Sequence, residues 1–147
     1  MTTTILVLNG PNLGRLGTRE PEVYGSETLA DIEAGLAASV PDDVSIEMRQ
    51  SDDEAELIGW LHEAVDRRLP VVLNPAAFTH YSYALRDAAA QLKQAGLPLV
   101  EVHLSNPHSR ETFRHTSVIS GVATGVIAGF GADSYRLAVD WVLRSRG

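Results

Sequence analysis

The chain has 147 residues, of which 44% are hydrophobic and 21% charged, and its formal net charge is -7. This length suits one domain, residues 1–147, around one core. The negative charge disfavours a nucleic-acid or acidic-membrane partner, because long-range repulsion opposes the approach to phosphate. Without cysteine, disulfides, zinc–thiolate sites and thiol nucleophiles are excluded. No apolar run approaches the roughly 20 residues that cross a bilayer, and the N-terminus has no basic cluster typical of a secretory signal. We therefore expect a cytoplasmic protein.

Short apolar runs rich in β-branched residues alternate with longer helical patterns. The expected strands are 5–8, 44–50, 71–73, 99–104 and 125–128. Near-continuous apolar runs are typical of parallel strands that are covered on both faces. The pattern predicts an α/β fold: a flavodoxin-like, doubly wound, five-stranded parallel sheet of order 2-1-3-4-5, with helices on both faces.

Four helices are expected around these strands. Apolar residues recur at helical spacing at Leu29, Ile32, Leu36 and Val40, at Leu57, Ile58, Leu61 and Val65, and at Leu85, Ala88, Ala89 and Leu92. The run 51–54 has the pattern of a capping box that opens the second helix. Gly96, followed by Pro98, is expected to end the third, and a last helix is expected over about 133–144.

Ligands of open parallel sheets bind beyond the carboxyl ends of the strands. The segments expected there, 9–19, 74–80 and 101–106, carry asparagine, histidine, glutamate and arginine. The first matches neither a phosphate-binding loop nor a dinucleotide fingerprint. A long glycine-hinged segment with Arg19 and Tyr24 suits a lid that closes over a ligand, although a mobile surface loop with an incidental arginine fits the spacing equally well.

Two pairs of side chains are spaced for joint action. Glu101 and His103 are two apart in a predicted strand, so both point to one side of the sheet, where the carboxylate could orient the imidazole or stabilise its charged form. Arg110 and Arg114 are four apart in a predicted short helical segment, and from one face they could grip a carboxylate. Arginines exposed beside acids are the alternative for this second pair.

Other chemistries receive less support. Lys93, the only lysine, falls in a helix pattern beside glutamines, and a solvated lysine there disfavours a Schiff base. The histidines and carboxylates do not show the spacing of a metal site. A flavodoxin-like flavin-binding or signalling module is the alternative of another class, but Asn74 stands where a receiver domain needs a phosphorylatable aspartate.

Many segments of the chain resemble blocks of the type II 3-dehydroquinate dehydratases, also called type II dehydroquinases. The similar segments, in order, are 9–17, 19–21, 24–25, 50–52, 74–75, 79–80, 84–87, 101–106 and 113–114. Because several independent motifs match in register over nearly the whole chain, the resemblance is far more specific than one glycine-rich loop. It implies dehydration of 3-dehydroquinate to 3-dehydroshikimate with no metal, cofactor or Schiff base.

The resemblance also implies residue roles. Tyr24 would be the general base that removes a proton from the carbon next to the ketone, and Arg19 beside it would favour the tyrosinate, since a guanidinium stabilises a nearby anion. Asn12 would hold a water that stabilises the enolate. His103 would protonate the departing hydroxyl from the opposite side of the ring, which makes the reaction an anti elimination, with Glu101 as the partner of this histidine.

The same resemblance assigns the substrate-binding groups. Asn74, His80 and Arg114 would hold substrate hydroxyls, and the backbone at Leu104 and Ser105 would bind the carboxylate. The reaction belongs either to the shikimate pathway of aromatic amino-acid biosynthesis or to quinate breakdown, and the sequence does not distinguish these roles.

A homo-oligomer is expected as well. Members of the resembled family form dodecamers built from trimers, and Asp87 would reach the site of a neighbouring subunit. The sequence departs from the family pattern at Ala76, Ala77, Phe78 and Tyr81. These differences concern the substrate-binding turn, and so the affinity more than the reaction type.

Overall fold

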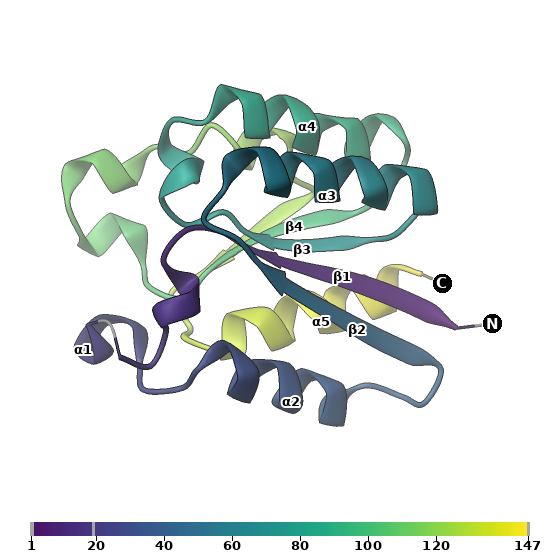
Figure 1. Ribbon diagram of the computed structural model, residues 1–147, viewed down its shortest axis with the longest axis horizontal. Coiled ribbons are helices and arrows are strands. Elements are labelled where there is room, and N and C mark those ends of the chain that lie inside the picture. Colours follow the sequence, from purple (N-terminus) through teal and green to yellow (C-terminus); the bar gives the residue numbers. More distant parts are fainter. Residues whose placement is uncertain (1, 19, 147) are drawn as a thin grey trace.

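The computed structural model describes residues 2–18 and 20–146. Its strands are β1 (Thr3–Asn9), β2 (Val44–Gln50), β3 (Val71–Asn74), β4 (Leu99–His103) and β5 (Gly125–Ala128). They form one parallel sheet in the order β2-β1-β3-β4-β5, which confirms the predicted flavodoxin-like topology (Figure 1). Each predicted strand is present, with ends that differ by at most two residues.

Helices cover both faces of this sheet. The longer ones are α2 (Leu29–Ser39), α3 (Glu54–Arg67), α4 (Tyr83–Gln94) and α5 (Asp133–Ser145). Helices α3 and α4 lie on one face, and α2 and α5 lie on the other (Figure 1). None of the helices in the described part of the chain is long and apolar enough to span a membrane.

Strand β1 shows why the sheet is buried on both sides. Its four central residues, 5–8, are fully buried. Leu6 and Leu8 join the core beneath α3 and α4, whereas Ile5 and Val7 join the core beneath α2 and α5. Successive side chains of a strand point to opposite faces, so a continuous apolar run supplies both layers.

The predicted capping box at the start of α3 is wrong. Asp53 is the N-cap, and its carboxylate accepts a hydrogen bond of 2.9 Å from the Ala55 amide. Ser51 precedes this N-cap by two residues, and its Oγ accepts a hydrogen bond of 2.9 Å from the Asp53 amide. Its own amide still donates to Asn9 of β1, so the helix begins later than the sequence pattern predicts. Instead, a capping box is found at the start of α2, between Thr28 and Asp31.

Short elements gather at the carboxyl edge of the sheet. They are α1 (Pro21–Tyr24) and the 3-10 turns η1 (Leu13–Arg15), η2 (Ala76–His80), η3 (Pro107–Ser109), η4 (Thr112–His115) and η5 (Ser120–Val122). In Figure 1, α1 and the turns that follow β4 lie at one end of the sheet, whereas β1 begins and α5 ends at the other. The polar segments predicted to form the site therefore meet at one edge.

Candidate active site

A cavity of about 240 Å³ lies beyond the carboxyl ends of β1, β3 and β4. The residues that line it are Pro11, Asn12, Leu13, Tyr24, Asn74, Ala76, Ala77, His80, His103, Leu104, Ser105, Pro107, Arg110, Phe113 and Arg114. Most of the residues predicted for the site are therefore brought together in one wall, although they come from four separate parts of the sequence.

The loop after β1 is held firmly at its start. Gly10 donates a backbone hydrogen bond of 2.8 Å to Asn74, and a Cβ at this position would lie 2.6 Å from the carbonyl oxygen of Pro75. Only glycine allows so close an approach of two backbones. Asn12 adopts a left-handed conformation with φ 70°, and its amide donates to Asp52 at 2.9 Å. These contacts fix the backbone that carries Asn12 to the cavity.

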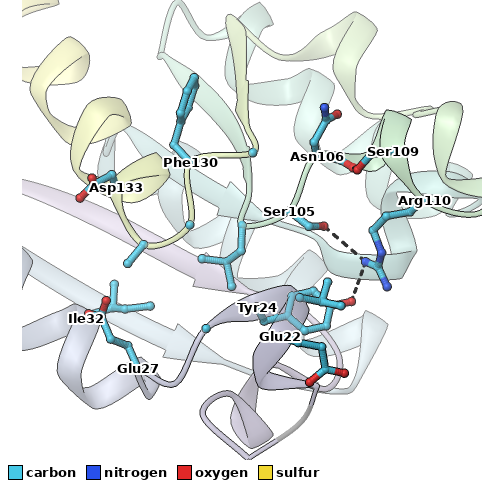
Figure 2. Close-up of a pocket in the computed structure, with 16 residues that line it drawn as sticks. Glu22, Tyr24, Glu27, Ile32, Ser105, Asn106, Ser109, Arg110, Phe130 and Asp133 are labelled. Carbon is cyan, nitrogen blue, oxygen red and sulfur yellow. Dashed lines mark hydrogen bonds between the residues drawn. The ribbon is translucent and has the colours of Figure 1, made fainter.

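Tyr24 ends helix α1 and meets an arginine from the far side of the site. Arg110 Nη1 donates a hydrogen bond of 2.7 Å to the Tyr24 hydroxyl and one of 3.3 Å to Ser105 Oγ. Figure 2 shows this guanidinium between the two hydroxyl groups. Its central carbon also lies 5.0 Å from the centre of the Tyr24 ring. The Tyr24 hydroxyl and ring are thus both in contact with this cation.

The two arginines after β4 do not share a helical face, and that prediction is wrong. Arg110 follows turn η3 with an extended backbone, and Arg114 lies in the separate turn η4. The chain bends at Arg110, and the carboxylate of the next residue, Glu111, accepts a hydrogen bond of 2.9 Å from Arg114 Nε. This hydrogen bond lowers the pKa of Glu111. Both arginines nevertheless line the cavity, because the bend turns them to the same side.

Glu101 and His103 are paired as their spacing predicts. Glu101 is fully buried, and its Oε2 lies 2.5 Å from His103 Nε2. Thr79 and Ser120 also donate to this carboxylate, at 2.5 and 2.6 Å. Burial alone would raise the pKa of Glu101, but the hydrogen bond and charge of His103, with the two hydroxyl groups, hold this pKa below its ordinary value. The carboxylate is therefore anionic and holds the imidazole ring in place.

His80 and Asn74 line the wall that follows β3. His80 Nδ1 lies 2.8 Å from the carbonyl oxygen of Thr116, and its ring packs edge-on against Phe113 at 5.7 Å between centroids. A carbonyl oxygen only accepts, so Nδ1 carries a hydrogen. Asn74 is almost fully buried, and its Oδ1 accepts a hydrogen bond from the Ala76 amide at 3.1 Å. Both polar groups are thus oriented before any ligand binds.

Comparison with known proteins identifies the family to which this constellation belongs. The family model described as Dehydroquinase class II matches residues 3–143. The chain belongs to the class II dehydroquinase family. It is 64% identical to the 3-dehydroquinate dehydratase of Kineococcus radiotolerans, with 92% of this chain and 91% of the relative covered. With the 3-dehydroquinate dehydratase 2 of Pseudomonas aeruginosa the identity is 53%, and the covered shares are 95% and 93%.

A solved structure supports the same assignment. The fold is similar to that of the type II dehydroquinase from Propionibacterium acnes, with a TM-score of 0.91. That chain is 50% identical to this one, and the comparison covers 97% of each. The flavodoxin-like sheet described above is thus the fold of this dehydroquinase family.

Two residues considered in the sequence lie outside this cavity wall, and a third is not among those that the structure describes. Arg19 falls outside the described residues. Asp87 is on the exposed side of α4, with 72% of its side chain accessible, and it pairs with Arg86 at 2.9 Å. It does not line the cavity of its own chain. Lys93 is exposed in the last turn of α4 and also lies outside the cavity wall.

A second, larger hollow of about 650 Å³ lies beside the first (Figure 2). Tyr24, Ser105 and Arg110 belong to the walls of both. Its rim carries the carboxylates of Glu22 and Asp133, among others. The hydrogen-bonded group of Tyr24 and Arg110 therefore stands where the two hollows of this dehydroquinase meet.

Several site residues escaped the sequence analysis. The sequence pattern indicates Arg110 only as the partner of Arg114. Its position shortly after β4 is the feature that could have placed it in the site. Thr79 lies in the segment 79–80 that resembles the family, but no role was predicted for it; Ser120 and the buried Tyr135 gave no signal, because serine and tyrosine are common in loops and helices. Their contacts with the site exist only in the folded chain.

Proposed function

We propose that this type II 3-dehydroquinate dehydratase eliminates water from 3-dehydroquinate through an enolate, in an anti elimination with no Schiff base. The observation that carries the proposal is the placement of Tyr24 and His103 in one cavity wall, each in contact with a charged side chain. Tyr24 meets the Arg110 guanidinium, and His103 meets the Glu101 carboxylate. A paired base and acid of this kind suit an elimination that needs both at once.

Tyr24 acts as the base in the first step. Its tyrosinate takes a proton from the carbon next to the ketone, the electrons of that C–H bond move toward the carbonyl oxygen, and an enolate forms. Arg110 favours the tyrosinate through the hydrogen bond of 2.7 Å. Arg19 is proposed to act beside it, and Asn12 is proposed to hold a water that stabilises the enolate oxygen.

His103 acts as the acid in the second step. The enolate reforms the ketone, a carbon–carbon double bond forms beside it, and the C–O bond of the leaving hydroxyl breaks. His103 gives its proton to that oxygen, so the products are 3-dehydroshikimate and water. Glu101 holds the ring through the contact of 2.5 Å and stabilises its charged form. The tyrosine proton then returns to the histidine through solvent, which closes the cycle.

Positive charge and hydrogen-bonding groups near this pair would bind the substrate. Asn74, His80 and Arg114 are proposed to hold its hydroxyl groups, and the backbone at Leu104 and Ser105 its carboxylate. Local arginines can attract an anionic substrate although the whole chain carries a net charge of -7.

The assembly and the cellular role are part of the same proposal. We propose a homo-dodecamer built from trimers, in which Asp87 of one subunit completes the site of its neighbour. The exposed position of this carboxylate, outside the cavity wall of its own chain, supports such a role. The enzyme would serve aromatic amino-acid biosynthesis or quinate breakdown in the cytoplasm.

Ultraviolet absorbance tests the reaction directly. The purified protein is treated with a chelator and mixed with 3-dehydroquinate, and the conjugated enone of the product is followed over time. Turnover at the same rate before and after chelation, and resistance to borohydride reduction in the presence of substrate, would support an elimination without metal or imine. A well-folded protein that forms no enone would refute the proposed reaction.

A further inference from the structure

A fully buried tyrosine lies behind the proposed substrate site and takes no part in the proposed chemistry. Tyr135, on α5, is 0% exposed. Its hydroxyl donates a hydrogen bond of 2.6 Å to Asn9 Oδ1 at the end of β1 and accepts one of 2.9 Å from Asn74 Nδ2 at the end of β3. Burial raises the pKa of this phenol, so the hydroxyl keeps its proton. A phenol placed between two asparagines can therefore set the orientation of both amides.

The hydrogen bonds of Asn9, Tyr135 and Asn74 form a continuous series, and the backbone groups at its two ends determine the direction of each bond. Asn9 Nδ2 donates to the backbone carbonyl of Arg49 at 3.0 Å, and that oxygen can only accept. Asn9 must therefore turn its Oδ1 to the Tyr135 hydroxyl, which donates to it and is left to accept from Asn74 Nδ2. At the far end, Asn74 Oδ1 accepts from the Ala76 amide at 3.1 Å, and an amide can only donate. The backbone groups at both ends of the series therefore require the same orientation of the Asn74 side-chain amide.

This series of hydrogen bonds holds a turn that lines the cavity. Ala76 has a left-handed backbone with φ 52°, which is unfavourable for a residue with a Cβ. Its amide is bound by Asn74 Oδ1, so the asparagine fixes the turn as well as its own amide. Asn74 and Ala76 both line the cavity. If the amide of Asn74 rotated, the turn and the polar atoms offered to the substrate would change together.

We propose that Tyr135 is a positioning residue for substrate recognition: its hydroxyl, anchored by Asn9, locks the Asn74 amide in the orientation that binds a substrate hydroxyl. The inference rests on the proposed function, because it assigns the substrate contact to Asn74. The residue acts through Asn74 and does not touch the reacting atoms. It should therefore affect KM much more than kcat.

The test compares Tyr135→Phe with Asn74→Ala and with the double variant, using kcat and KM for 3-dehydroquinate. Tyr135→Phe removes only the hydroxyl, and we expect KM to rise roughly three- to tenfold, the effect of about one hydrogen bond, with kcat nearly unchanged. In the Asn74→Ala background the same substitution should not raise KM further, since its effect passes through the missing amide. Val139→Ala is the matched control: it removes packing one turn further along the buried face of α5, so it should lower Tm and leave KM unchanged.

Each outcome bears on the inference. An unchanged KM in folded Tyr135→Phe, or a rise of equal size in the Asn74→Ala background, would overturn it. Should Tyr135→Phe not fold, Asn9→Ala removes the acceptor of the same hydroxyl and is judged by the same two criteria. A wild-type protein with no turnover would refute the proposed function and this inference together, whereas wild-type turnover with an unaffected variant would refute the inference alone.

Discussion

Arg110 Nη1 lies 2.7 Å from the hydroxyl of Tyr24, although 86 residues separate the two in the sequence. In the proposed mechanism this guanidinium stabilises the negative charge of the base, and its loss should remove this stabilisation. We expect Arg110→Met to lower kcat by roughly 10- to 100-fold, which corresponds to one charge-assisted hydrogen bond of about 1.5–3 kcal/mol. Steady-state kinetics with 3-dehydroquinate measure the change.

Arg136→Met is the matched control for this substitution. Arg136 is exposed on α5, pairs with Asp133 at 2.5 Å and does not line the cavity that holds Tyr24 and His103. Its replacement should leave kcat at the wild-type level. A folded Arg110→Met variant with wild-type kcat would show that the contact with Tyr24 has no part in the reaction.

Replacement of Tyr24 by phenylalanine tests the base itself. The variant keeps the ring and loses the proton acceptor, so we expect kcat to fall by about 1,000-fold while KM stays within a few-fold of the wild type. Tyr83→Phe changes an exposed tyrosine of α4 in the same way and should have no effect on kcat. Turnover like that of the wild type in Tyr24→Phe would exclude this residue as the base.

The fold was predictable because its signals are local and repeated. Continuous apolar strands and helices with one apolar face leave few arrangements other than a doubly wound sheet, and strand β1 meets this expectation on both faces. Details of the helix ends were less predictable. Ser51 has the right type for a cap, but its amide remains bound to β1, and this contact cannot be read from the neighbouring residues.

The candidate site was predictable wherever residues end a strand or lie just beyond it. Asn74, His103 and Ser105 follow from the rule that carboxyl ends of parallel strands share an edge. Contacts over long sequence separations were not predictable. Tyr135 lies 126 residues from Asn9, and the role of Arg110 depends on the bend between two 3-10 turns.

Glu101→Gln should separate the charge of the buried carboxylate from its shape. The amide nitrogen of glutamine would replace an oxygen that now accepts from the Thr79 or the Ser120 hydroxyl, so that hydroxyl would have to turn and accept instead. The negative charge beside His103 would be lost. We expect kcat to fall by roughly 100-fold and the protein to lose about 1–3 kcal/mol of stability. Kinetics and urea unfolding check both effects, and Glu56→Gln, an exposed change on α3, is the control. Wild-type kcat in a folded Glu101→Gln enzyme would contradict the proposed pairing.

The surface cluster of Glu47, Arg49, Glu63 and Arg67 predicts a pH dependence of stability. Hydrogen bonds from Arg49 at 2.8 Å and Arg67 at 2.7 Å lower the pKa of Glu63 from 4.5 to about 2. Because the folded protein binds this proton less readily than the unfolded chain, the stabilisation is complete above about pH 4.5 and is lost as the pH falls toward 2. Exposure limits the contribution to less than about 1 kcal/mol.

Glu63→Gln should therefore lower the free energy of unfolding at pH 6 and flatten its fall between pH 4.5 and 2. Urea unfolding at a series of pH values measures the difference between variant and wild type. Glu56→Gln on the same helix should keep the wild-type slope. Parallel pH curves for Glu63→Gln and the wild type would show that the ion pairs contribute nothing to stability.

Asp87 offers a test of the proposed assembly that does not depend on dissociating it. If this carboxylate completes the site of a neighbouring subunit, Asp87→Asn and Tyr24→Phe homo-oligomers should both have low activity, whereas mixed oligomers regain sites with an intact Tyr24 and an intact neighbouring Asp87. Random mixing at equal amounts should restore about a quarter of the wild-type sites. Co-expression of Asp87→Asn with the double variant Tyr24→Phe/Asp87→Asn is the control, since no pairing of these chains supplies both groups. Equal activity of the two mixtures would mean that Asp87 does not act across a subunit boundary. An Asp87 that acts only within its own subunit cannot restore activity to a neighbouring subunit that lacks it.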